Sequence, residues 1–160
     1  MNEEVTVATA EEMRDLGRDL AALLRAGDLV ILSGPLGAGK TTLTQGIGDG
    51  LAVRGPITSP TFVIARVHPP LAGRGAGTAL VHADAYRLGS ALELDDLDLD
   101  ADTDTSVTVV EWGEGLAEGL AADRLEITIH GDEPRTVRVH GVGSRWRDVQ
   151  MSRADVIDRL

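Results

Sequence analysis

Short hydrophobic runs alternate with amphipathic stretches along most of this 160-residue chain. A strand is predicted at residues 5–8, and the capping box formed by Thr9 and Glu12 predicts that a helix follows it and is closed by Gly27. The apolar face of that helix consists of Met13, Leu16, Leu20, Leu23 and Leu24. The aliphatic run at 29–32 is typical of a buried strand. Beyond a glycine-rich loop, a helix is predicted with Leu43, Ile47 and Leu51 on one face.

The second half of the chain contains more strands. Gly55 and Pro56 interrupt the pattern, and residues 61–68 and 79–86 then predict two strands that pair antiparallel. Residues 91–104 are acidic and dotted with leucine, which favours an exposed amphipathic helix running into a loop. The remaining predicted elements are a strand at 107–110, a helix at 116–122, a hairpin of strands 125–130 and 136–140, and a final helix at 146–160 with Val149, Val156, Ile157 and Leu160 buried.

Composition narrows the class of protein. A chain of 160 residues with 42% hydrophobic residues predicts one domain, 1–160, that buries about 70% of its unfolded surface. The absence of cysteine excludes disulfides and thiolate metal sites. No apolar run approaches the roughly 20 residues of a membrane span, and the acidic start lacks a signal peptide's positive region, so we expect a cytoplasmic protein. The net charge of -11 argues against direct binding to a polyanion, so a nucleic acid would have to be reached through a partner.

The chain has a single lysine, Lys40, in the segment GPLGAGKT at 34–41, which matches the phosphate-loop pattern GxxxxGK[ST]. Because every other basic residue is arginine, this one flexible ammonium is expected to do what arginine cannot. Its expected contacts are the β- and γ-phosphates of a nucleotide, while the Thr41 hydroxyl would bind Mg²⁺. The predicted nucleotide-binding residues of this segment are Gly34, Pro35, Leu36, Gly37, Ala38, Gly39, Lys40, Thr41 and Thr42. A strand before the loop and a helix after it complete an anion site.

Phosphoryl transfer needs an acidic residue near Mg²⁺, and such residues commonly end a buried strand. Glu111 follows the aliphatic run VTVV and is favoured as the carboxylate beside the metal. Asp84 follows LVHA, a run interrupted by His82, and is left to orient or deprotonate a water. Either acid could instead be a structural cap.

Neither the histidines nor the aromatic residues point to one role. His68, His82, His130 and His140 show no metal-ligand spacing, so we expect them to be ordinary strand or turn residues. Phe62, Tyr86 and Trp112 are three of the four aromatic residues and stand within a few positions of the acidic candidates or of Thr61. They either wall the site, stack on a base or belong to the core.

Four segments in this order resemble the TsaE family of bacterial ATPases: GPLGAGKTTLTQGIGDGL, ITSPTFVI, VHADAYRL and VVEWGEGL. That family assists threonylcarbamoylation of the adenosine next to the anticodon in tRNAs that read codons beginning with adenine. The resemblance spans residues 34–120 and departs at the Gly- and Pro-rich loop 69–78. It implies an α/β, single-domain P-loop NTPase with a mixed sheet, in which a parallel core and antiparallel hairpins are flanked by helices.

The resemblance also implies roles and partners. Glu111 would complete the metal site formed with Thr41, and Asp84 would be the acidic residue needed for hydrolysis. Thr61 resembles a switch-like threonine near the γ-phosphate, and Trp112, in the pair EW, would couple the nucleotide site to a partner surface. The implied partners are the transferase TsaD and its dimer partner TsaB, with tRNA reached only through that complex. The ATPase of the protein alone would then be slow.

Other functions share a phosphate loop. A small-molecule kinase would need an arginine-bearing lid, and no lid-like helical insertion is visible in the sequence. A GTPase usually reads its base with an NKxD or TKxD segment, which this chain lacks because its one lysine lies in the loop. A module that senses nucleotide without hydrolysing it would use the same binding residues, and only a measurement of turnover distinguishes it.

Overall fold

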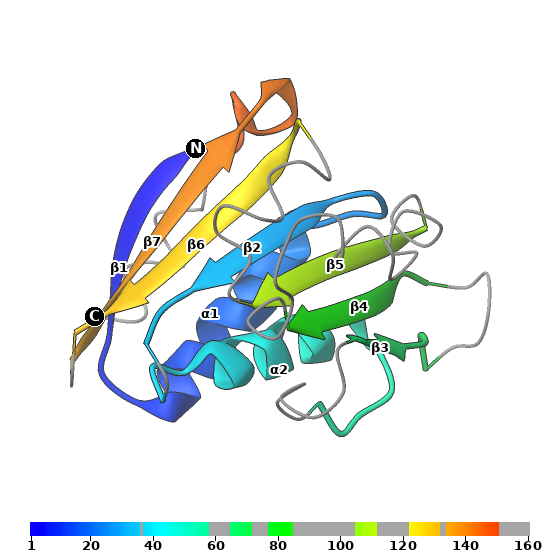
Figure 1. The fold of residues 1–160 in the computed structure, drawn as a ribbon, viewed down its shortest axis with the longest axis horizontal. Coiled ribbons are helices and arrows are strands. Elements are labelled where there is room, and N and C mark those ends of the chain that lie inside the picture. Colours follow the sequence, from blue (N-terminus) through cyan, green and yellow to red (C-terminus); the bar gives the residue numbers. More distant parts are fainter. Residues whose placement is uncertain are drawn as a thin grey trace.

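In the computed structural model the described residues are 1–35, 37–57, 65–71, 77–84, 105–111, 122–131 and 134–150. Seven described strands form one sheet in the order β1-β7-β6-β2-β5-β4-β3 (Figure 1). The strands are β1 (Asn2–Val7), β2 (Leu29–Ser33), β3 (Ala65–His68), β4 (Ala79–Asp84), β5 (Ser106–Glu111), β6 (Arg124–His130) and β7 (Arg135–Val142). The α-helices of the described part are α1 (Ala10–Leu23) and α2 (Lys40–Leu51).

The sheet is mixed, as the sequence predicts. Strand β2 pairs parallel with both β6 and β5, and β4 pairs parallel with β5. The pairs β3–β4 and β6–β7 are antiparallel, which confirms both predicted hairpins. Strand β1 pairs antiparallel with β7 and lies at one edge of the sheet.

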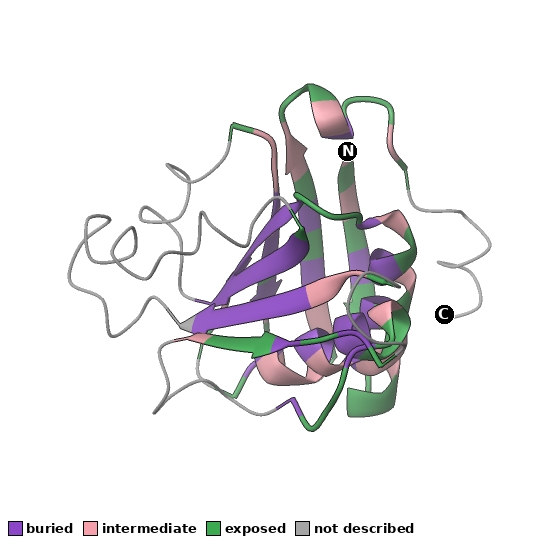
Figure 2. Ribbon diagram, turned by 90° about the vertical axis from the view of Figure 1, so that its right-hand side faces the viewer, coloured by how far each residue is buried: buried purple, intermediate pink, exposed green. Residues whose placement is uncertain are grey.

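How far the strands are buried differs between the parallel and the antiparallel parts of the sheet. All of β5 and most of β2 are buried, whereas buried and more exposed positions alternate along β6 (Figure 2). Parallel strands buried on both faces are expected to be aliphatic throughout, and antiparallel strands with one wet face are expected to alternate. The continuous runs and the alternating runs of the sequence therefore correspond to the centre and to one end of the sheet.

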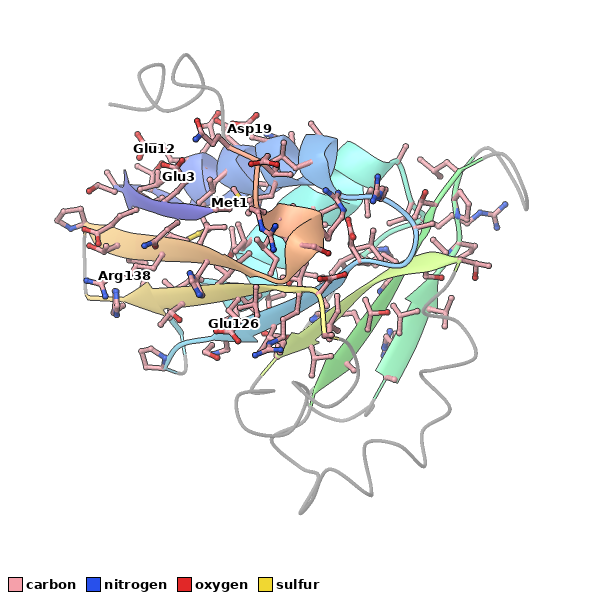
Figure 3. The ribbon with its side chains drawn as sticks, turned by 90° about the horizontal axis from the view of Figure 1, so that it is seen from above. Met1, Glu3, Glu12, Asp19, Glu126 and Arg138 are labelled. Atoms are coloured by element: carbon pink, nitrogen blue, oxygen red, sulfur yellow. The ribbon has the colours of Figure 1, made fainter. Side chains whose placement is uncertain are left out.

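Helices α1 and α2 lie together on one face of the sheet, while Glu126 of β6 and Arg138 of β7 lie on the other face (Figure 3). The two helices approach each other closely because Gly17 and Gly46 face the partner helix: a Cβ atom on either glycine would overlap backbone of the other helix. The hydrophobic core lies between the helices and the sheet and includes Leu16, Leu20, Leu43, Ile47, Val30, Leu32, Val109 and Ile127.

The predicted start of α1 is confirmed. The Thr9 hydroxyl accepts a hydrogen bond from the Glu12 amide at 3.1 Å, and the Glu12 carboxylate accepts one from the Ala8 amide at 2.7 Å. Both contacts satisfy backbone donors that have no partner inside the helix. Helix α1 ends at Leu23, and Gly27 lies in the following turn with φ 95°.

The predicted helix at 146–160 is wrong at its start. A 3₁₀ turn at Ser144–Trp146 stands there instead, and no α-helix includes residues 146–150. Trp146 is 1% exposed, and the Arg145 guanidinium lies 4.2 Å above its ring. Arg145 also donates to Leu23 O at 2.7 Å and to an Asp28 carboxylate oxygen at 3.1 Å, which ties this turn to the loop after α1.

Several other predictions fall outside the described residues. They are the strand segments 61–64 and 85–86, the helix at 91–104, nearly all of the helix at 116–122, and residues 151–160 of the final helix. Within the described part of the chain, none of the helices has the length and apolar character of a membrane span.

Candidate functional site

The phosphate loop joins the carboxyl end of β2 to the start of α2. Gly37 and Gly39 have φ angles of 77° and 104°, which residues with a Cβ rarely adopt. Gly34 is a glycine for a different reason, because a Cβ there would lie 2.8 Å from Ile129 O of β6. The motif glycines thus do two separate things: two allow the left-handed turns of the loop, and one lets it pass the neighbouring strand.

Lys40 spans the loop from its end to its beginning. The Lys40 ammonium donates to Gly34 O at 2.7 Å and to Pro35 O at 3.0 Å, and the residue is only 6% exposed. The Ala38 amide donates to Pro35 O at 3.1 Å across the same turn. Helix α2 begins at Lys40, so the partial positive charge of its N-terminus adds to the ammonium. The loop, the ammonium and the helix end together supply the kinds of groups from which anion sites are built.

The two acidic candidates lie at the edge of the sheet from which this loop emerges. Glu111 is the last residue of β5, and its register partner on β2 is Leu32, two residues before Gly34. On its other side the register partner of Glu111 is Asp84, the last residue of β4. Because the carboxyl ends of parallel strands meet at one edge, the predicted acids and the loop share that edge. Glu111 is 4% exposed.

Sequence reasoning missed a partner of Glu111. The His82 imidazole Nε2 lies 2.6 Å from Glu111 Oε2, and His82 is fully buried. The register explains the contact, because His82 pairs with Val109, which is two residues before Glu111 and therefore faces the same side of the sheet. The available signal was the histidine itself, a polar residue that interrupts the otherwise aliphatic strand LVHA.

Four predicted site residues cannot be placed in this geometry. Leu36, Thr61 and Trp112 lie outside the described residues, and of Asp84 the structure describes the backbone position alone. The residues that the structure does bring together are the loop, Lys40, Thr41 at the start of α2, and Glu111.

The donors near the loop suit a hard divalent cation. The Thr41 hydroxyl and the Glu111 carboxylate carry oxygen atoms, the donor type that Mg²⁺ prefers. Among the described residues no group of three or more histidine, aspartate or glutamate side chains could hold a metal by itself. Mg²⁺ in nucleotide sites is commonly bound by one or two protein oxygens together with phosphates and waters, so this sparse donor set fits an ion that arrives with a nucleotide.

A pocket of about 170 Å³ opens beside the loop. Gly37, Gly39 and Thr42 form one wall, and Arg135 of β7 and Met13 of α1 contribute others. Its remaining lining residues are Val7, Ala8, Thr9 and Ala10, where β1 passes into α1. These residues come from three separate parts of the chain, so no local sequence pattern could have grouped them.

Comparison with known proteins gives one consistent answer. The sequence model of the family described as threonylcarbamoyl adenosine biosynthesis protein TsaE matches residues 7–139. The chain is 60% identical to the tRNA threonylcarbamoyladenosine biosynthesis protein TsaE of Streptomyces coelicolor over 147 residues, covering 88% of this chain and 97% of that protein. It is 36% identical to the protein of the same name from Bacillus subtilis over 151 residues, covering 92% of each.

A solved structure agrees with the sequence comparison. The crystal structure of Bacillus subtilis YdiB superimposes on 91% of this chain and 89% of its own, with a TM-score of 0.72 and 31% sequence identity. The mixed sheet, the phosphate loop after β2 and the helix that follows it are those of a P-loop NTPase, as predicted from the sequence.

Proposed function

Because this chain belongs to the TsaE family of threonylcarbamoyl adenosine biosynthesis proteins, we propose that it serves threonylcarbamoyladenosine modification of tRNA as an ATP-binding accessory protein. In this proposal it hydrolyses ATP slowly and acts on a pair of TsaD-like and TsaB-like proteins. The observation that carries the nucleotide part is the phosphate loop spanned by the Lys40 ammonium, with Glu111 at the end of the adjoining strand.

In the proposed complex, backbone N–H groups of the loop and the start of α2 bind the phosphates, and Lys40 neutralises part of their charge. Lys40 and the loop backbone act mainly by positioning, because phosphoryl transfer depends chiefly on alignment and charge neutralisation. Thr41 and Glu111 would hold Mg²⁺, which would supply further positive charge to neutralise the phosphates. The pocket lined by Thr42 and Arg135 is where we place the nucleoside.

Hydrolysis requires a water held in line with the γ-phosphate. We propose that Asp84 orients or deprotonates this water, since its backbone lies opposite Glu111 at the same edge of the sheet. Thr61 is proposed to respond to the γ-phosphate, and Trp112 to pass the state of the site to a partner surface.

The charge of the chain supports an indirect route to tRNA. With a net charge of -11, the protein lacks the excess of basic residues that a phosphate backbone attracts. We therefore propose that the partner pair carries the tRNA contacts and that the protein works with it in the cytoplasm.

The test is phosphate release from ATP and from GTP by the purified protein, alone and with a TsaD–TsaB pair added. We expect slow turnover of ATP that rises when the pair is present. Nucleotide binding without turnover in either condition would replace the proposal with a nucleotide sensor. Fast turnover alone, a preference for GTP, or phosphate transfer to a small molecule would contradict it.

A further inference from the structure

His82 is a polar residue in an apolar setting. It lies within β4 among Leu80, Val81 and Ala83, each of which is at most 1% exposed, and it is itself fully buried. Burying the two ring nitrogens of a histidine costs free energy unless they are hydrogen-bonded, and an aliphatic side chain has no such cost. Within the described part of the chain its one hydrogen-bond partner is Glu111, and its Nδ1 atom has none.

The contact between the two side chains is short. Nε2 of His82 and Oε2 of Glu111 are 2.6 Å apart, slightly closer than the usual range for a nitrogen–oxygen hydrogen bond. Both residues are buried, so solvent does not compete for the contact.

We propose that His82 is a positioning residue that fixes the Glu111 carboxylate toward the metal and phosphates of the bound nucleotide. Strand β5, which ends at Glu111, lies between β4, which carries His82, and β2, which leads into the phosphate loop. With Oε2 held by the imidazole, the plane of the carboxylate is set, and Oε1 is the oxygen that remains to serve the metal side. This inference rests on the proposed function of the loop as a nucleotide site.

The physical benefit is preorganisation. A glutamate side chain has several rotatable bonds, and ordering it costs conformational entropy. His82 would order the Glu111 side chain when the protein folds, so this entropy is not lost when the metal and nucleotide bind. Hydrogen-bond partners behind metal ligands commonly change metal affinity about 10- to 100-fold when they are removed.

The test measures how strongly Mg²⁺ promotes binding of a non-hydrolysable ATP analogue to the full chain by calorimetry. His82→Leu removes the ring nitrogens and should raise the half-saturating Mg²⁺ concentration about tenfold or more. His82→Gln can restore a donor near the Nε2 position and should return the value toward wild type. The affinity measured in EDTA should be the same for all three proteins, because the phosphate loop itself is unchanged.

The matched control is His68→Leu. His68 is also a buried histidine, on the neighbouring strand β3, but its Nδ1 atom contacts Arg54 O at 3.2 Å rather than a carboxylate. This variant should keep the wild-type Mg²⁺ requirement.

The inference is overturned if His82→Leu keeps the wild-type requirement for Mg²⁺, or if its affinity in EDTA falls as much as its affinity with Mg²⁺. A failure of His82→Gln to improve on His82→Leu would also overturn it. If His82→Leu does not fold, the comparison of His82→Gln with the wild-type protein decides, because a Gln variant with a tenfold raised requirement contradicts a hydrogen-bond role. Absence of nucleotide binding by the wild-type protein would remove the proposed function as well.

Discussion

Replacing Lys40 by alanine should weaken nucleotide binding strongly. A hydrogen bond to a charged group contributes about 1.5–3 kcal/mol, which corresponds to a dissociation constant about 10- to 150-fold higher. The Lys40 ammonium also donates to Gly34 O and Pro35 O, at 2.7 Å and 3.0 Å. Because alanine loses these two ties within the loop together with the phosphate contact, we expect a loss toward the upper end of that range.

The assay is calorimetric titration with a non-hydrolysable ATP analogue in Mg²⁺, at one fixed salt concentration. Arg66→Ala is the control, since Arg66 is an exposed residue of β3 and its loss removes the same unit of charge. That variant should bind within about twofold of wild type, because exposed charges contribute little at a distance. A Lys40→Ala protein with folded-state spectra and a dissociation constant within twofold of wild type would refute the assignment of the loop.

Three further results are expected. Gly46→Ala should lower the free energy of unfolding in urea by about 1–3 kcal/mol, because the new Cβ overlaps the backbone of Arg14; helix propensity alone predicts a gain of about 1 kcal/mol, so a stabilised variant would contradict the packing argument. Asp84→Ala should keep ATP affinity and lose about 100-fold or more in turnover, whereas a binding loss equal to that of Lys40→Ala would assign Asp84 to the metal instead. Burial lowers the pKa of His68 below its ordinary value of 6.5. The unfolded chain therefore binds that proton more tightly than the folded protein does. The free energy of unfolding should fall as pH drops through 6.5 toward the folded-state pKa. His68→Gln should flatten this part of the profile in urea titrations between pH 7.5 and 5.5, and an unchanged slope would exclude His68 as its source.

The local elements were predictable because their signals are local. A continuous aliphatic run predicts β2, and the glycine-rich motif predicts the phosphate loop. Apolar residues spaced four apart predict α2. None of these signals depends on the rest of the chain. The hairpin of β6 and β7 was equally accessible, because alternating strands flank a turn containing Gly131 and Pro134.

The C-terminal prediction failed because periodicity does not reveal what a residue packs against. The sequence predicts a helix that begins at Trp146 and has Val149 on its buried face. Trp146 instead fits against Gly141 of β7, where a Cβ atom would collide with the indole side chain. Arg145 fixes the same turn through Asp28, a residue more than a hundred positions away in the chain.

The link between His82 and Glu111 was out of reach for a related reason. It depends on the order of strands in the sheet and on their register, and both are set by long-range pairing. The sequence marks His82 as a polar residue within an aliphatic run, but the pattern of one strand gives no information about a neighbour on the next.

The phosphate loop is held in shape by residues that the motif does not contain. The backbone of β6 lies against Gly34 through Ile129 O, and the Met13 side chain of α1 lies against Gly39, where its Cε would be 3.2 Å from an added Cβ. Met13 is 2% exposed and reaches this position because α1 packs closely on α2. A loop fixed from both sides presents its N–H groups in place before the anion arrives, so less free energy is spent on ordering it. Packing residues such as Met13 therefore belong to the nucleotide site in energetic terms, even where they touch no phosphate.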